Sequence, residues 1–125
     1  MRLLAGMLLL ASVSCFSSPT ESGSASGTMT LRFGETAIAG DTRVSFTDIT
    51  DSRCPRDVVC AWEGDAAVRL ESGNDHVVLH TSGRMGPIEA RLDRVTLALV
   101  DVRPTPDSRQ PTNKTEYVVT LRVSR

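Results

Sequence analysis

Residues 116–123 read EYVVTLRV, and apolar and polar positions alternate along this segment. In an extended chain Tyr117, Val119 and Leu121 would point to one side, whereas Thr120 and Arg122 would point to the other. Alternation with a period of two indicates a β-strand that has one face in a core and one face in solvent. The segment therefore predicts a sheet with one buried side.

The same alternation recurs from residue 29 onward and predicts eight short strands. They are 29–33, 35–38, 43–50, 66–71, 76–80, 88–92, 95–102 and 116–123. Turn-forming residues such as Gly40, Gly73 and Gly83 separate them, and a proline-rich loop over 104–115 precedes the last one. Since no segment keeps a helical period, we predict an all-β fold, an antiparallel, immunoglobulin-like β-sandwich of about seven or eight strands.

The size and charge of the chain limit the classes of function that it could have. Its 125 residues suffice for one domain. The 14 basic and 15 acidic residues give a net charge of -1 and are interspersed. A protein that binds nucleic acid instead gathers basic residues on one face. We therefore expect no nucleic-acid partner.

The first 15 residues have the features of a bacterial lipoprotein signal. Arg2 precedes an apolar run over 3–13, which is shorter than the roughly 20 residues that cross a bilayer. Small residues lead to Cys15, as in a lipobox whose cysteine is acylated; an ordinary signal cleaved at another bond is the alternative. We expect residues 16–29 to form a flexible Ser/Gly-rich tether and residues 30–125 the domain, exported and lipid-anchored in the cell envelope.

The cysteine count agrees with this interpretation. An odd number of cysteines in an exported protein needs an explanation, and the chain has three. Lipidation of Cys15 leaves Cys54 and Cys60 as a pair, which an oxidising compartment would join in a disulfide. Closing so small a loop stabilises the fold by about 2.4 kcal/mol.

The segment 51–66 around these cysteines is the most distinctive part of the chain. We predict an interaction loop here, carried by Arg53, Pro55, Arg56, Trp62 and Glu63. We also expect the Trp62 ring to lie over the disulfide or the end of a sheet.

Several short motifs resemble a family of small bacterial secreted proteins and lipoproteins of uncharacterised function. The motifs are D-S-R-C-P at 51–55, C-A-W-E-G at 60–64, A-x-V at 66–68, P-x-P at 104–106 and Y-x-V-x-L-x-V at 117–123. The most specific residues are Asp51, Ser52, Arg53, Cys54, Pro55, Cys60, Trp62 and Gly64. The resemblance covers roughly residues 30–125 and implies an exported β domain with a disulfide loop, but no reaction.

The sequence supports a metal site or an active site less well than it supports a binding domain. The two cysteines with His76 and His80 superficially match a zinc finger, but residues four apart on a strand lie about 13 Å apart. Acidic residues that could hold calcium, such as Asp51 and Asp57, are interleaved with arginines that favour ion pairs. No nucleophile motif accompanies the histidines. We expect no metal, no cofactor and no enzyme activity.

These expectations favour one function and leave two alternatives. The first is a non-catalytic domain that binds a protein partner or serves the envelope structurally, attached to the membrane by its lipid. The second is an inhibitor of an exported hydrolase, in which the loops 53–62 and 104–111 would enter the cleft of the enzyme. The third is a small hydrolase or metal-dependent enzyme, which would need a pocket with a perturbed histidine or carboxylate cluster.

Overall fold

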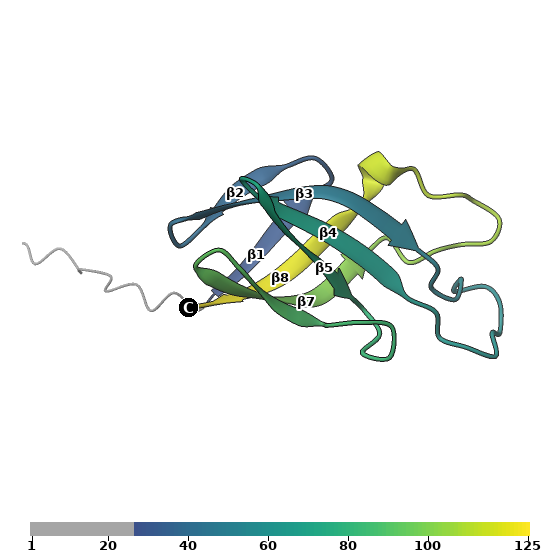
Figure 1. The fold of residues 1–125 in the computed structure, drawn as a ribbon. Helices are drawn as coiled ribbons and strands as arrows, with labels where there is room; N and C mark the ends of the chain where they lie inside the picture. The colour runs from purple at the N-terminus through teal and green to yellow at the C-terminus, as the bar shows by residue number, and fades with distance from the viewer. Residues whose placement is uncertain (1–26) are drawn as a thin grey trace, which may run out of the picture.

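The computed structural model describes residues 27–125, which form two antiparallel sheets packed face to face (Figure 1). The strands are β1 (Gly27–Arg32), β2 (Thr36–Ala39), β3 (Thr42–Asp51), β4 (Ala66–Ser72), β5 (Asp75–His80), β6 (Glu89–Leu92), β7 (Val95–Arg103) and β8 (Val118–Ser124). A single 3-10 turn, η1 (Lys114–Glu116), precedes β8. The predicted all-β, antiparallel sandwich of about eight strands is confirmed.

The order of the strands differs from the immunoglobulin-like connectivity that we expected. One sheet has the order β1-β8-β7-β6 and the other β2-β3-β4-β5. Strands that follow one another in the chain are therefore neighbours within each sheet, as in an up-and-down meander, and the chain changes sheet between β1 and β2 and between β5 and β6. An immunoglobulin domain needs connections that cross repeatedly between its sheets. Hairpins join five of the seven consecutive pairs of strands in this chain instead, three of them through short turns, and they keep those strands side by side.

The chain passes from the first sheet to the second at a sharp corner between β1 and β2. The Phe33 amide still donates to the carbonyl oxygen of Tyr117 at 3.0 Å, in line with β8. The next amide, that of Gly34, donates to the carbonyl oxygen of Phe46 on β3 at 2.8 Å. Gly34 has a φ of 80°, a conformation that a residue without a Cβ adopts at no steric cost. This corner ties the two sheets together along one edge.

The core lies between the sheets and follows the alternation seen in the sequence. On β8, Val119 and Leu121 are fully buried, and on β3 Val44 and Phe46 are fully buried opposite them. The ring of Phe46 meets that of Phe33 edge-on, with centroids 5.4 Å apart. Bulges in β3 and in β7 each shift the register by one residue, so the alternation changes phase there.

The sandwich has two different ends. We call the end at which β1 begins and β8 ends the proximal end, where Gly27 pairs with Val123. At the distal end lie the disulfide loop (52–65), the β5–β6 loop (81–88) and the β7–β8 loop (104–117). The strand between the two ends is long: from Val118 to Val123, β8 extends roughly 17 Å. Figure 1 shows the start of β1 beside the C-terminus and the loops at the opposite end.

The N-terminal predictions fall mostly beyond the part of the chain that the structure describes. The signal over 1–15, the lipidation of Cys15 and residues 16–26 of the tether all lie outside the described residues. Residues 27–29, which we assigned to the tether, pair with β8 and belong to the domain. Met29 is also the start of the predicted strand 29–33, whereas the small or polar side chains of Gly27 and Thr28 give no strand signal; ladder hydrogen bonds need only the backbone. Among residues 27–125, no helix is long and apolar enough to cross a membrane.

Candidate functional site

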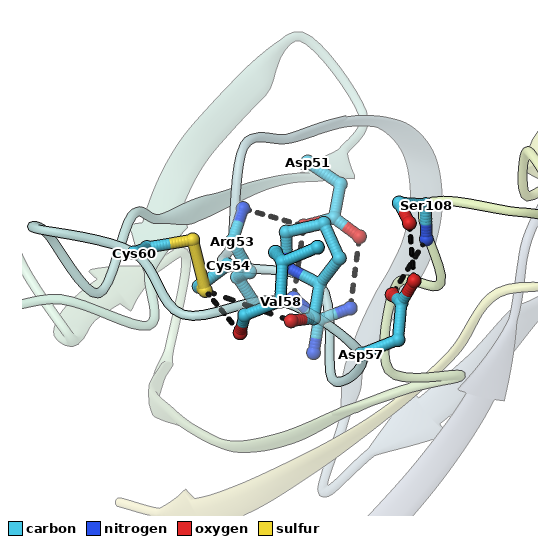
Figure 2. Close-up of a disulfide and its surroundings, with 8 residues drawn as sticks. Asp51, Arg53, Cys54, Asp57, Val58, Cys60 and Ser108 are labelled. Carbon is cyan, nitrogen blue, oxygen red and sulfur yellow. Dashed lines mark hydrogen bonds and ion pairs between the residues drawn. A yellow bond between two sulfur atoms is a disulfide. The ribbon is translucent and has the colours of Figure 1, made fainter.

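The disulfide loop is closed at its base in two ways. The predicted disulfide between Cys54 and Cys60 is present, with their Cα atoms 5.9 Å apart (Figure 2). Below it the chain pairs with itself: the Cys54 amide donates to the carbonyl oxygen of Glu63 at 3.0 Å. The amide and the hydroxyl of Ser52 both donate to the carbonyl oxygen of Asp65, at 2.7 and 2.8 Å. The loop is therefore an extension of the β3–β4 hairpin with a covalent staple.

Gly64 is required where the two sides of this base approach each other. Its φ is 69°, in the left-handed region. A Cβ on this residue would lie 2.8 Å from Arg53 Cα and still closer to the carbonyl oxygen of Ser52. Both the conformation and the close approach exclude a side chain here.

Asp51, Arg53 and Tyr117 form a largely buried polar network beneath the disulfide loop. Arg53 donates from Nε to Asp51 Oδ1 at 2.8 Å and from Nη2 to Asp51 Oδ2 at 2.9 Å (Figure 2). The Tyr117 hydroxyl donates to Asp51 Oδ2 at 2.7 Å. The same guanidinium also donates from Nη1 to the carbonyl oxygen of Val102 at 2.7 Å and from Nη2 to that of Pro104 at 2.8 Å. Arg53 thus joins the disulfide loop to the end of β7.

The pKa values of this network follow from its burial and hydrogen bonds. Burial acts to raise the pKa of Asp51, but hydrogen bonds from Arg53 and Tyr117 outweigh it, and the pKa lies below its usual range. Burial first, and then the hydrogen bond to the Asp51 carboxylate, raise the pKa of Tyr117 to about 12. The network is therefore ionised as a carboxylate, a guanidinium and a neutral phenol at neutral pH.

The disulfide loop is also joined to the β7–β8 loop near its tip. The Arg56 amide donates to the carbonyl oxygen of Pro106 at 2.9 Å, and the Arg56 guanidinium lies 3.1 Å from Asp107. Asp57 accepts hydrogen bonds from the amide of Ser108, at 2.9 Å, and from its hydroxyl (Figure 2). The two loops that we named as candidate wedges are joined to each other by these contacts.

On its other side the disulfide loop is joined to the β5–β6 loop through Asp65. The Asp65 carboxylate accepts from the Ser82 amide at 2.9 Å and lies 2.7 Å from His80 Nδ1. Ser82 donates from its hydroxyl to Glu63 at 2.9 Å. The imidazole of His80 packs so closely on Gly86 that a Cβ there would collide with the ring. His80 therefore holds the β5–β6 loop in place and does not lie on an open strand face.

The predicted interaction residues separate into two groups. Arg53 is 16% exposed and belongs to the buried network, whereas Arg56, Trp62 and Glu63 are exposed. Pro55 is half-buried at the start of the loop. Trp62 does not cover the disulfide or the sheet as we expected, since it is 80% exposed.

Two further apolar residues are exposed at the distal end, and we predicted neither of them from the sequence. Val59, at the tip of the disulfide loop, is completely exposed, and Met85 of the β5–β6 loop is 64% exposed. The exposure of Val59 could have been predicted from the sequence, because an apolar residue in a short loop between two cysteines does not belong to a strand that faces the core. Nothing in the sequence placed Met85 opposite Trp62.

Two of the grooves at the distal end border its exposed side chains. One, of about 820 Å³, lies along the β7–β8 loop, and its charged side chains pair with one another, Arg56 with Asp107 and Arg103 with Asp101. The other, of about 530 Å³, lies between the disulfide loop and the β5–β6 loop, with Trp62 and Met85 among its walls. We call the second the Trp62 groove.

Within the described residues, the side chains that suggested a metal site have other partners. Within residues 27–125, no three His, Cys, Asp or Glu side chains gather so that they could hold a metal ion. Of the residues considered as zinc ligands, Cys54 and Cys60 are joined in the disulfide, and His80 pairs with Asp65. The arginines of the disulfide loop, which we expected to form ion pairs, do so: Arg53 pairs with Asp51, and Arg56 pairs with Asp107 of the β7–β8 loop.

Comparison of the chain with protein-family models, curated proteins and solved structures found no match. The family resemblance drawn from the motifs stays a prediction.

Replacing Gly64 by Ala will test the close approach at the base of the loop. We expect Gly73→Ala to cost about 1–2 kcal/mol, since Gly73 shares the left-handed φ but has open space around it. Gly64→Ala adds a backbone collision to the same strain, so the free energy of unfolding, measured with urea, falls by at least about twice as much. Equal losses in the two variants would show that the approach seen here is wrong.

Tyr117 is the only tyrosine, so its ionisation can be followed directly by phenolate absorbance. We expect a midpoint near pH 12 in the folded protein, against about 10 in urea. Because the folded pKa is the higher one, this group stabilises the fold fully below pH 10, and the contribution is lost as the pH rises toward 12. The stability advantage of the wild type over Tyr117→Phe therefore shrinks across that window. A folded midpoint near 10 would contradict the buried hydrogen bond to Asp51.

Proposed function

We propose that this chain is an exported, non-catalytic binding domain, anchored through Cys15 in a bacterial cell envelope, whose distal end recognises a protein partner. The observation that carries the proposal is the exposure of Trp62 and Val59 on a loop that a disulfide and two neighbouring loops immobilise. The motif resemblance and the N-terminal signal support export.

Exposed apolar side chains on a rigid loop suit binding better than they suit folding. Trp62 at 80% exposure and Val59 at full exposure contribute little to the core. Tryptophan is among the residues that most often dominate the affinity of protein interfaces. Since the hydrogen bonds of Arg53, Arg56 and Asp57 already order the loop, little conformational entropy remains to be lost on association.

The position of the N-terminal strand supports the same function. β1 begins at the proximal end, so a tether that precedes it joins the domain opposite the disulfide loop. A lipid on Cys15 would then hold the proximal end toward the membrane and leave the distal loops facing away from it. This orientation suits recognition of a partner across the envelope.

A second candidate function is inhibition of an exported hydrolase. Val59 protrudes from a covalently closed loop, and the β7–β8 loop supports that loop through Pro106 and Ser108. A preformed, protruding loop is what an inhibitor inserts into a cleft. A panel of proteases and lysozymes, assayed with the purified domain and with Val59→Asp, separates this role from simple binding.

Site-specific photo-crosslinking in intact cells will test the binding function. We expect a photoreactive amino acid at Val59 to give an adduct of one reproducible mass with an envelope protein. The matched control position is Ile38, which is 61% exposed but lies on β2. A copy with Cys15→Ser, which cannot be acylated, should leave the membrane fraction and lose most of the adduct.

The result that contradicts the proposal is equally clear. If positions 59 and 38 give the same set of products, or neither gives a product, the distal end is not the binding surface. If the Cys15→Ser copy stays in the membrane fraction, the anchor is not the lipid that we propose.

A further inference from the structure

We propose that the Trp62 groove binds a basic side chain, lysine or arginine, of the protein partner. This inference rests on the proposed function and names the chemistry that the distal end recognises.

The walls of the groove suit a cation carried on an apolar stem. Trp62 is 80% exposed, so its ring is open to a partner, and tryptophan is the aromatic residue that attracts cations most strongly. Met85, 64% exposed on the β5–β6 loop, supplies a flexible apolar surface that adapts to methylene groups. The volume of about 530 Å³ lies within the range of small binding sites.

The charges of the groove favour a cation as well. Two carboxylates, those of Glu63 and Asp65, line it against one guanidinium, that of Arg84. The Asp65 side chain is only 6% exposed, so salt screens its field less than that of a surface carboxylate. The side chains that line the groove thus carry one more negative than positive charge beside an open aromatic ring, and Asp65 also contacts His80 Nδ1 at 2.7 Å.

The positions of the two carboxylates are set by the same contacts that hold the loops together. Asp65 accepts from the Ser82 amide, and Glu63 accepts from the Ser82 hydroxyl through Oε1. Asp65 and Ser82 are buried at the base of the groove, whereas Glu63 is exposed beside Trp62. A partner side chain thus meets a prearranged acceptor, which lowers the ordering cost of binding.

The opposite occupant, an acidic side chain bound by Arg84, is the alternative that the test must separate. Arg84 is exposed and is the one guanidinium that lines the groove. An acidic ligand would meet Arg84 but would also face both carboxylates. We therefore expect the positive charge of Arg84 to repel a basic side chain in the groove and to weaken its binding.

The single tryptophan of the chain makes the experiment direct. The full-length protein with Cys15→Ser is titrated with acetyl-Gly-X-Gly-amide peptides in which X is arginine, lysine, norleucine or glutamate, and the emission of Trp62 is followed. We expect arginine or lysine to bind at least about fivefold more tightly than norleucine, and glutamate to bind no more tightly than norleucine. Preference for glutamate, or no saturable change with any peptide, would overturn the inference.

Two substitutions give effects of opposite sign. Glu63→Gln keeps an acceptor for the Ser82 hydroxyl but removes the charge, so affinity for the arginine peptide falls at least about threefold. Arg84→Gln removes the like charge, so affinity rises about two- to threefold. Arg43→Gln, an exposed arginine on β3, is the matched control and changes nothing. If Arg84→Gln weakens binding, the groove takes an acid and the inference is wrong.

Failure here is distinguishable from failure of the proposed function. The photo-crosslink at Val59 reports whether the distal end meets a partner, whatever the groove holds. A persistent adduct at Val59 with no basic-peptide binding overturns only the assignment of the groove.

Discussion

The guanidinium of Arg53 donates hydrogen bonds to the Asp51 carboxylate on one side and to the carbonyl oxygens of Val102 and Pro104 on the other. Through these contacts it joins the end of β3 in one sheet to the end of β7 in the other. The network is largely buried, and Tyr117 supplies a further donor to the carboxylate. Removing one partner of a buried ion pair costs about 3–5 kcal/mol, because the remaining charge is left without compensation. The arrangement of the distal loops depends on this contact.

The disulfide and the arginine network act at different scales. The Cys54–Cys60 bond closes a small loop, and its contribution of about 2.4 kcal/mol concerns that loop alone. The network places the closed loop on the sandwich, after which Arg56 and Asp57 join it to the β7–β8 loop. Asp65 joins the β5–β6 loop on the other side. A rigid surface that carries Trp62 and Val59 results from all of these contacts together.

Sequence reasoning could predict the strands and the disulfide but not the way in which the loops meet. The alternation of segments such as 116–123 is a local property, and so it predicted all eight strands with small errors at their ends. Arg53 looked like an exposed contact residue because its carbonyl acceptors lie 49 and 51 positions further along the chain. The meander order and the exposure of Trp62 likewise depend on long-range packing. No spacing within 51–66 carries that information.

Hydrogen exchange in an Arg53→Lys variant tests the central claim most directly. Lysine keeps the positive charge but cannot reach the carboxylate and both carbonyl oxygens with one planar group. The amides of Arg56 and Ser108, which bond to Pro106 and Asp57, should lose protection together by at least about tenfold. The amide of Leu121 in β8 should keep its protection. If Arg56 and Ser108 stay protected, or if only one of them loses protection, Arg53 does not hold the distal loops as a unit.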